Sequence, residues 1–130
     1  PLKYLGVFFF KGVVFEDDTV QGRELIGKVP RYVNKYLQFF SDLCLQEYSF
    51  QKYRTSLLAS AIIAASRRAL YIKPLWCREL EELTAYSATD IWDCYEHIWN
   101  FYAQSFPAEV AERYIENDSH YTSPNSVMYC

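Results

Sequence analysis

The sequence predicts an all-α domain arranged around a central helix over residues 55–70. In this stretch leucine, isoleucine and alanine cover nearly the whole circumference of a helix, and a helix that is apolar on all sides is a buried one. Amphipathic helical patterns precede and follow it, and the 130 residues suffice for one compact core. The apolar run ends at Arg67-Arg68, well short of the roughly 20 residues that span a bilayer.

The central stretch is rich in small side chains, namely those of Ala59, Ser60, Ala61, Ala64 and Ala65. They allow the backbones of neighbouring helices to approach closely. A buried serine needs a hydrogen-bond partner, and we expect Ser60 to donate its hydroxyl to the carbonyl of Ser56, four residues back. This stretch is therefore expected to be wrapped by other helices.

A helix is predicted to begin at Val29-Pro30, because proline suits a first helical turn. Its apolar residues recur at steps of three and four, and they are Val33, Tyr36, Leu37, Phe40, Leu43 and Cys44. Residues 48–54 connect this helix to the central one. We expect the aromatic residues of that connection to fill the corner between the two helices.

Two more helices are predicted after Pro74, which disfavours helical geometry in the residue before it. The first is short and ends near Tyr86, with Trp76, Leu80 and Leu83 inward and Glu79, Glu81 and Glu82 outward. Ser87 and Asp90 have the spacing of a capping box that opens the second. That helix should end near Pro107, and its apolar face consists of Ile91, Trp92, Tyr95, Ile98, Trp99, Tyr102 and Phe106.

The two ends of the chain have weaker patterns. Residues 2–15 suit either two short strands around Lys11-Gly12 or an apolar helix, and residues 16–28 are predicted to be a surface connection. A further helical turn is expected over residues 110–115. We therefore divide the chain into an N-terminal segment, residues 1–28, a helical domain, residues 29–106, and a polar tail, residues 107–130.

Composition excludes some classes of function. The net charge of −3 gives no basic face for nucleic acid, and Arg67-Arg68 are expected to complement the dipole at a helix end. The cysteines, Cys44, Cys77, Cys94 and Cys130, form no CxxC motif and are predicted to be reduced thiols. The apolar residues 4–15 lack the features of a secretory signal, so an intracellular location, nuclear or cytoplasmic, is expected. The chain begins at Pro1, so a longer protein is also expected.

Few residues are candidates for chemistry. Asp90 and Asp93 could hold a cation, but both lie in a predicted first helical turn, where acidic residues are favoured. Cys94 and His97 are one turn apart and could ligate zinc with Cys77, although a small core cysteine and a surface histidine explain them more simply.

The remaining candidates give no site either. His120 lies in the tail, the four glycines form no phosphate-binding loop, and the helical spacing of Trp76, Trp92 and Trp99 favours core packing over ligand stacking. No catalytic, cofactor-binding or metal-binding residue is assigned.

With the helices placed, residues 29–102 resemble the second, C-terminal cyclin box of A/B-type cyclins. The resemblance is carried by Tyr48-x-Phe50-x-Lys52-Tyr53-x-x-Ser56, then Leu57-x-Ala59-x-Ala61, and further on Trp76, Leu83-Thr84-Ala85-Tyr86-Ser87, Asp90 and Cys94. The chain departs from the family pattern at Arg54-Thr55 and Asp93, where proline is usual, and at Ala85, where glycine is usual.

The resemblance implies a five-helix cyclin fold around the Ala-rich helix. It also implies a non-catalytic regulatory subunit of a cyclin-dependent protein kinase, in which this domain braces a first cyclin box and offers surface to partners. No kinase-contact residue can be transferred, and Arg68-Ala69-Leu70 is on the wrong helix to be a recruitment motif. A cyclin-fold adaptor and, as a weaker alternative, a metal-dependent enzyme are the rival hypotheses.

Overall fold

The structure is a computed structural model, and it describes residues 19–20, 23–24 and 29–109. Side chains are described from Tyr32 onward. The elements are β1 (Thr19–Val20), β2 (Arg23–Glu24), α2 (Val29–Gln46), the 3-10 helix η1 (Tyr48–Lys52), α3 (Thr55–Ala69), β3 (Ile72–Lys73), α4 (Arg78–Thr84) and α5 (Ala88–Ser105). The protein has an all-α fold, as predicted, because the described strands are only two residues long.

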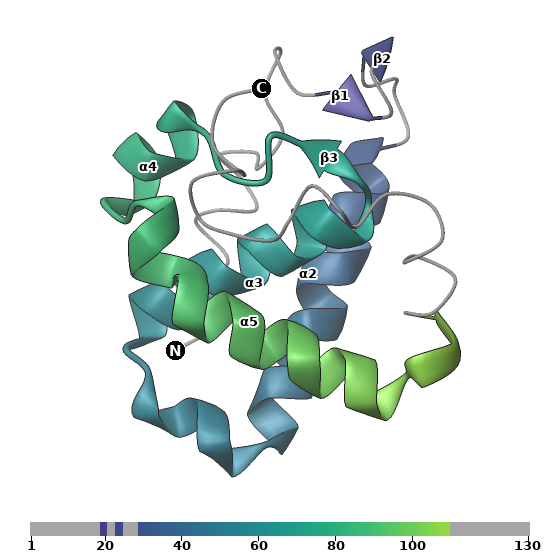
Figure 1. Ribbon diagram of the computed structural model, residues 1–130, viewed down its shortest axis with the longest axis vertical. Coiled ribbons are helices and arrows are strands. Elements are labelled where there is room, and N and C mark those ends of the chain that lie inside the picture. The colour runs from purple at the N-terminus through teal and green to yellow at the C-terminus, as the bar shows by residue number, and fades with distance from the viewer. Residues whose placement is uncertain (1–18, 21–22, 25–28, 110–130) are drawn as a thin grey trace.

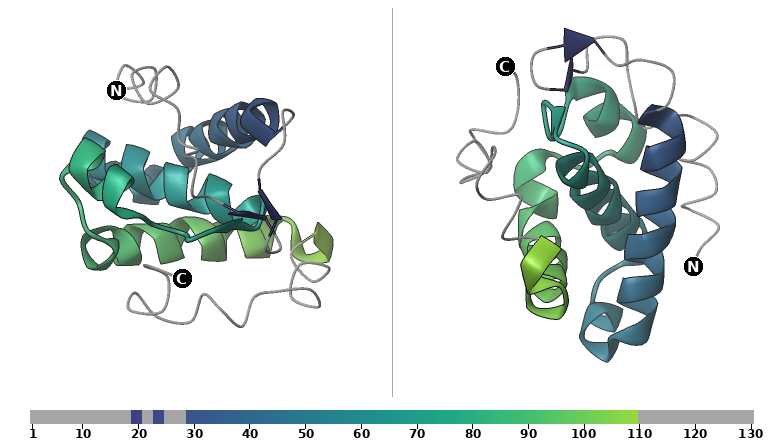
Figure 2. Two further views of the ribbon diagram at one scale, coloured as in Figure 1. Left: turned by 90° about the horizontal axis from the view of Figure 1, so that it is seen from above. Right: turned by 90° about the vertical axis from the view of Figure 1, so that its right-hand side faces the viewer.

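Helix α3 lies at the centre, with α2 on one side and α5 on the other (Figures 1 and 2). Every residue from Ala59 to Ala69 is buried, which confirms the central helix predicted from its all-round apolar pattern. The expected hydrogen bond is also present, with the Ser60 hydroxyl 2.8 Å from the carbonyl oxygen of Ser56.

In α2 and α5, the helices on either side of α3, the buried face is the one predicted from the spacing of apolar residues. The buried apolar side chains described on α2 are Val33, Leu37, Phe40 and Cys44, and those of α5 include Ile91, Tyr95, Ile98, Trp99 and Tyr102. At the start of α5 the Ser87 side chain accepts from the amide of Asp90, and Asp90 accepts from the amide of Ser87. This capping box fixes where α5 begins, as predicted.

The segment between α3 and α5 differs from prediction in one respect. Trp76 lies ahead of α4 rather than on it, and its ring is fully buried while its indole N–H donates to the carbonyl of Tyr86. Helix α4 ends at Thr84, and its C-cap residue Ala85 has a left-handed φ of 64°. Glycine adopts this conformation at a helix end without steric cost, which explains why the family pattern has glycine here.

A small antiparallel sheet was not predicted. Its strand order is β2-β1-β3, with Val20 opposite both Arg23 and Ile72. The prediction that residues 16–28 form only a surface connection is therefore wrong for β1 and β2. Strands of two residues are too short to show an alternating pattern, and the partner β3 lies far along the chain.

The expected strands or helix over residues 2–15, the helical turn over residues 110–115, His120 and Cys130 lie outside the described residues. The division of the chain at residues 28 and 106 stays a prediction.

Candidate partner-binding pocket

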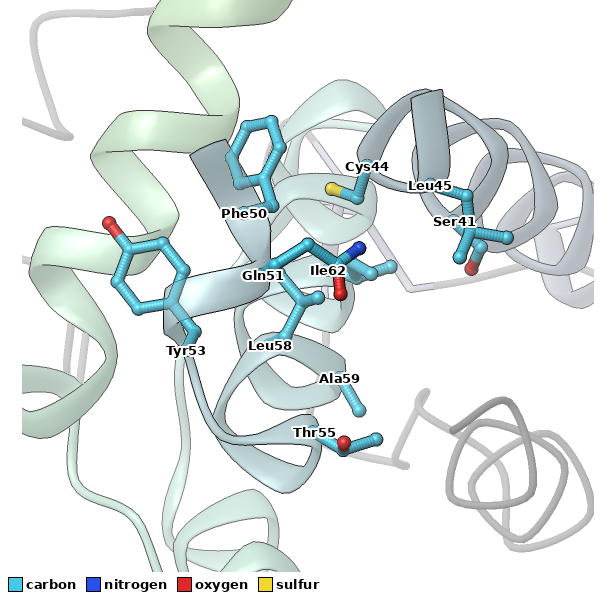
Figure 3. A pocket seen from close by; sticks show the side chains of 10 residues that line it. All are labelled: Ser41, Cys44, Leu45, Phe50, Gln51, Tyr53, Thr55, Leu58, Ala59 and Ile62. Carbon is cyan, nitrogen blue, oxygen red and sulfur yellow. The ribbon is translucent and has the colours of Figure 1, made fainter. Parts of the chain in front are cut away.

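A pocket of about 180 Å³ lies between α2, η1 and the first half of α3 (Figure 3). Its wall on α2 comes from Ser41, Cys44 and Leu45, and its wall on α3 from Thr55, Leu58, Ala59 and Ile62. The connection closes it with Phe50, Gln51 and Tyr53. Most of these side chains are apolar, so the pocket suits an apolar group.

The 3-10 helix η1 forms because Glu47 caps it, accepting the amide of Ser49 at 3.3 Å. This turn directs Phe50 into the core, where its ring stacks on His97 of α5 with centroids 4.2 Å apart. Tyr48 is 87% exposed. Thus Phe50 fills the corner between α2 and α3 as predicted, whereas Tyr48 does not.

Two basic residues are sequence neighbours of residues that line the pocket. Arg54 is the N-cap residue of α3, yet its side chain makes no capping hydrogen bond, and the first turn of α3 has no acidic residue. The ammonium of Lys52 lies 5.1 Å from the centroid of the Tyr53 ring. Both cationic side chains are exposed, and neither lines the pocket.

His97 joins η1 to α5 and is half-buried, so it keeps part of the surface exposure predicted for it while also contacting η1. Its Nδ1 is 2.9 Å from the Tyr53 hydroxyl and its Nε2 is 3.2 Å from the Ser49 hydroxyl. Burial, together with the nearby charge of Lys52, lowers the pKa of His97, and Glu47 partly opposes this. Both ring nitrogens have hydroxyl partners, so neither is available to a metal in this arrangement.

The other candidate metal ligands are not brought together. Asp90 is committed to the capping box, Asp93 is exposed, and Cys77 precedes α4. Burial raises the pKa of Cys94 to about 12, which opposes the thiolate that zinc requires. Within the part of the chain that the structure describes, no group of three His, Cys, Asp or Glu side chains is placed to hold a metal ion.

Arg67 and Arg68 are buried, which corrects the expectation that they only complement the helix dipole. Arg67 donates to the carbonyls of Leu75 at 3.0 Å and Pro74 at 2.7 Å. Arg68 donates to the Tyr95 hydroxyl at 2.7 Å and its guanidinium lies 4.1 Å from the Trp99 ring centroid. Arg67 therefore holds the segment after α3 against the core, and Arg68 joins α3 to α5.

The tryptophans pack in or against the core, as their spacing predicts. Trp76 and Trp99 are buried. Trp92 is half-buried, with its ring centroid 5.1 Å from that of Tyr95. They do not form a stacking platform.

The sequence patterns did not indicate the pocket. The one local signal was Leu45, an apolar residue outside the predicted buried face of α2, whose side chain is 51% exposed at the pocket edge. The other lining residues gave no sign of a cavity, because the pocket forms only where three elements meet.

Comparison with known proteins shows the family to which the chain belongs. Residues 25–125 match the family described as Cyclin, C-terminal domain. The chain therefore belongs to the cyclin family, and residues 25–125 are its C-terminal domain.

Cyclin-J from Xenopus laevis is 32% identical over 93 residues, covering 70% of this chain and 24% of that protein. The Cyclin-J-like protein of Mus musculus is 32% identical over 71 residues, covering 55% and 18%. The putative cyclin-B3-1 of Arabidopsis thaliana is 31% identical over 83 residues, covering 62% and 21%. The match thus spans at most about a quarter of each of these relatives. No solved structure matches the chain significantly.

Among the described helices, none combines the length and apolar character needed to cross a membrane.

Proposed function

We propose that this chain is the C-terminal cyclin box of a non-catalytic regulatory subunit of a cyclin-dependent protein kinase, acting inside the cell. In this role it braces a first cyclin box that precedes it. The observation that supports the proposal most directly is the family match over residues 25–125. The burial of α3 between α2 and α5 supports a bracing role, because a close-packed domain is rigid enough to support a neighbour.

The test uses the full-length product of the natural coding sequence. It should contain a first cyclin box upstream, and it should recover a serine/threonine protein kinase on co-precipitation and raise that kinase's activity. A full-length product that recovers no kinase would contradict the proposal.

The bracing role is tested separately with Ala64→Leu, which overpacks a fully buried position on α3. Kinase recovery should fall in this variant relative to a Thr89→Leu variant, which adds an apolar side chain at an exposed position of α5 that does not line the pocket. Equal recovery from both would leave kinase binding intact and exclude bracing.

A cyclin-fold adaptor is the second candidate function, and the apolar pocket between α2, η1 and α3 favours it. An adaptor would bind its partner with the same affinity whether or not a kinase is present.

A further inference from the structure

Ser49 presents an exposed hydroxyl group to a histidine of another helix. Its Oγ lies 3.2 Å from Nε2 of His97 on α5. The other ring nitrogen, Nδ1, is 2.9 Å from the Tyr53 hydroxyl, and this contact orients the ring so that Nε2 faces Ser49. In contrast, three buried serines donate to carbonyls of their own helices, namely Ser41, Ser60 and Ser66. The hydroxyl of Ser49 is therefore both accessible and placed beside a nitrogen that can carry positive charge.

Lys52 brings a second positive charge to the same place. Side chains three residues apart are eclipsed in a 3-10 helix, so Lys52 lies on the side of η1 that carries Ser49. Burial, and then the charge of Lys52, lowers the pKa of His97, which shows that the ammonium lies near the ring. An anionic group attached to Ser49 would thus have two basic side chains beside it.

Acidic groups also face this position. The carboxylate of Glu47 accepts the amide of Ser49 at 3.3 Å and partly opposes the lowered pKa of His97. On α5, Asp93 lies one turn before His97 and Glu96 precedes it directly, and both are exposed. Because Glu47 contacts the backbone of Ser49 whereas the side-chain oxygen contacts α5, a group on that oxygen meets His97 first.

The connection that carries Ser49 is weakly held. Its backbone N–H to O distances are 3.4 Å from Glu47 to Cys44, 3.2 Å from Phe50 to Glu47 and 3.3 Å from Tyr53 to Phe50, against about 2.9–3.0 Å for an ordinary hydrogen bond. Phe50 is the only buried residue of η1. Segments with few buried contacts open locally at low cost, so Ser49 can enter the active site of a modifying enzyme.

We propose that Ser49 is a phosphorylation site and that its phosphate joins η1 to α5 through His97 and Lys52. A serine/threonine protein kinase and ATP supply the group. The bond from the γ-phosphorus of ATP to its β–γ bridging oxygen breaks, a bond from that phosphorus to Ser49 Oγ forms, the hydroxyl proton passes to the catalytic base of the kinase, and ADP leaves.

The phosphate suits this position because it is both charged and rich in acceptors. A serine phosphate carries about −1.5 to −2 charge at pH 7 and three acceptor oxygens, and hydrogen bonds between ionised groups are the strong ones. It would replace the hydroxyl contact with His97 by an ion pair and add one with Lys52. The inference does not depend on the proposed function, because any serine/threonine kinase can supply the phosphoryl group.

The first experiment introduces phosphoserine genetically at position 49 of the full chain and follows the histidine signals by NMR as the pH is changed. A nearby anion favours the charged imidazole, so the pKa of His97 should rise above its value in the unmodified chain. The matched control carries phosphoserine at Ser105, an exposed serine at the end of α5 that lies about 12 Å further along the helix. Equal pKa values of His97 in the two phosphoproteins would overturn the proposal.

Thermal unfolding measures the link between η1 and α5. Phosphoserine at Ser49 should raise the melting temperature by about 3 °C, whereas phosphoserine at Ser105 should not, because it adds negative charge at a helix C-terminus. His97→Phe keeps a ring that can stack on Phe50 and should remove most of the rise. A rise of full size in the His97→Phe protein would contradict the proposed role of His97.

Use of the site is tested with the full-length protein isolated from its natural cells in the presence of phosphatase inhibitors. Trypsin cleaves after Lys35 and Lys52 and releases residues 36–52 as one peptide. Fragmentation of this peptide in the mass spectrometer separates a phosphate on Ser49 from one on Tyr48 or Ser41, and we expect it on Ser49. Recovery of the peptide only without phosphate, or with phosphate only on other residues, would overturn the proposal.

Discussion

The two ends of α3 place the same residue type in opposite environments. At the C-terminal end Arg67 is fully buried and donates to backbone carbonyls of the segment after the helix. At the N-terminal end Arg54 is exposed, makes no capping hydrogen bond and flanks an open pocket. One end of the helix is thus held by buried hydrogen bonds, whereas the other begins with an exposed residue that makes no side-chain cap.

The greatest loss of stability is expected from changes at the C-terminal end of α3. Arg67→Ala removes the donor for the carbonyls of Pro74 and Leu75, and leaving a buried acceptor unsatisfied costs about 1–3 kcal/mol. We expect the free energy of unfolding to fall by about 3 kcal/mol in urea denaturation. Arg54→Ala is the control and should change it by less than about 0.5 kcal/mol. Similar losses in both variants would erase the contrast between the two ends.

A second prediction concerns packing along α3. Ala64 is fully buried, and Ala61 is buried likewise, so replacing either by leucine should overpack the core and lower stability by about 1–3 kcal/mol. Thr55→Leu, at the N-terminal end of α3, should leave the free energy of unfolding nearly unchanged. A change near zero at Ala64, measured by thermal or urea unfolding, would mean that α2 and α5 do not enclose this face.

A smaller change, which raises stability, is expected at the N-terminal end of α3. Arg54→Asp supplies the missing N-cap of α3 and should stabilise the domain by about 1 kcal/mol. Ser87→Ala makes the reverse change, because it removes the existing N-cap of α5. It should destabilise the domain by a similar amount. If Arg54→Asp lowers the unfolding midpoint instead, the start of α3 is satisfied in some other way.

The weakest effect is a pH dependence at the link between η1 and α5. The folded state holds the pKa of His97 below its ordinary value of 6.5, mainly through burial. The unfolded chain therefore binds the proton more readily, so stability is complete above that value and falls as the pH drops below it. Melting temperatures measured between about pH 5 and 8 should show this decline. His97→Phe should reduce the slope, and an unchanged slope would mean that His97 titrates alike in both states.

Local patterns predicted much of the fold. The burial of residues 59–69, the Ser60 hydrogen bond and the Ser87–Asp90 capping box all depend on helical periodicity or on residues within about one turn of each other. Such features can be read from a continuous stretch of sequence.

Features that depend on distant parts of the chain were not predicted. Arg67 is buried because the segment carrying Pro74 and Leu75 folds back over the end of α3. His97 is half-buried because Ser49 and Tyr53, more than 40 residues earlier, pack against it. The pocket likewise draws its walls from three elements, and no single stretch of sequence contains it.

The buried thiols of Cys44 and Cys94 have a practical consequence. Burial raises the pKa of each to about 12, so at neutral pH both side chains are almost entirely in the protonated thiol form. Alkylating reagents attack the thiolate. They can therefore react with these two cysteines only after α2 or α5 separates from the core. The rate at which these cysteines are labelled thus reports how often the helix layers open, in the way that amide hydrogen exchange reports local unfolding.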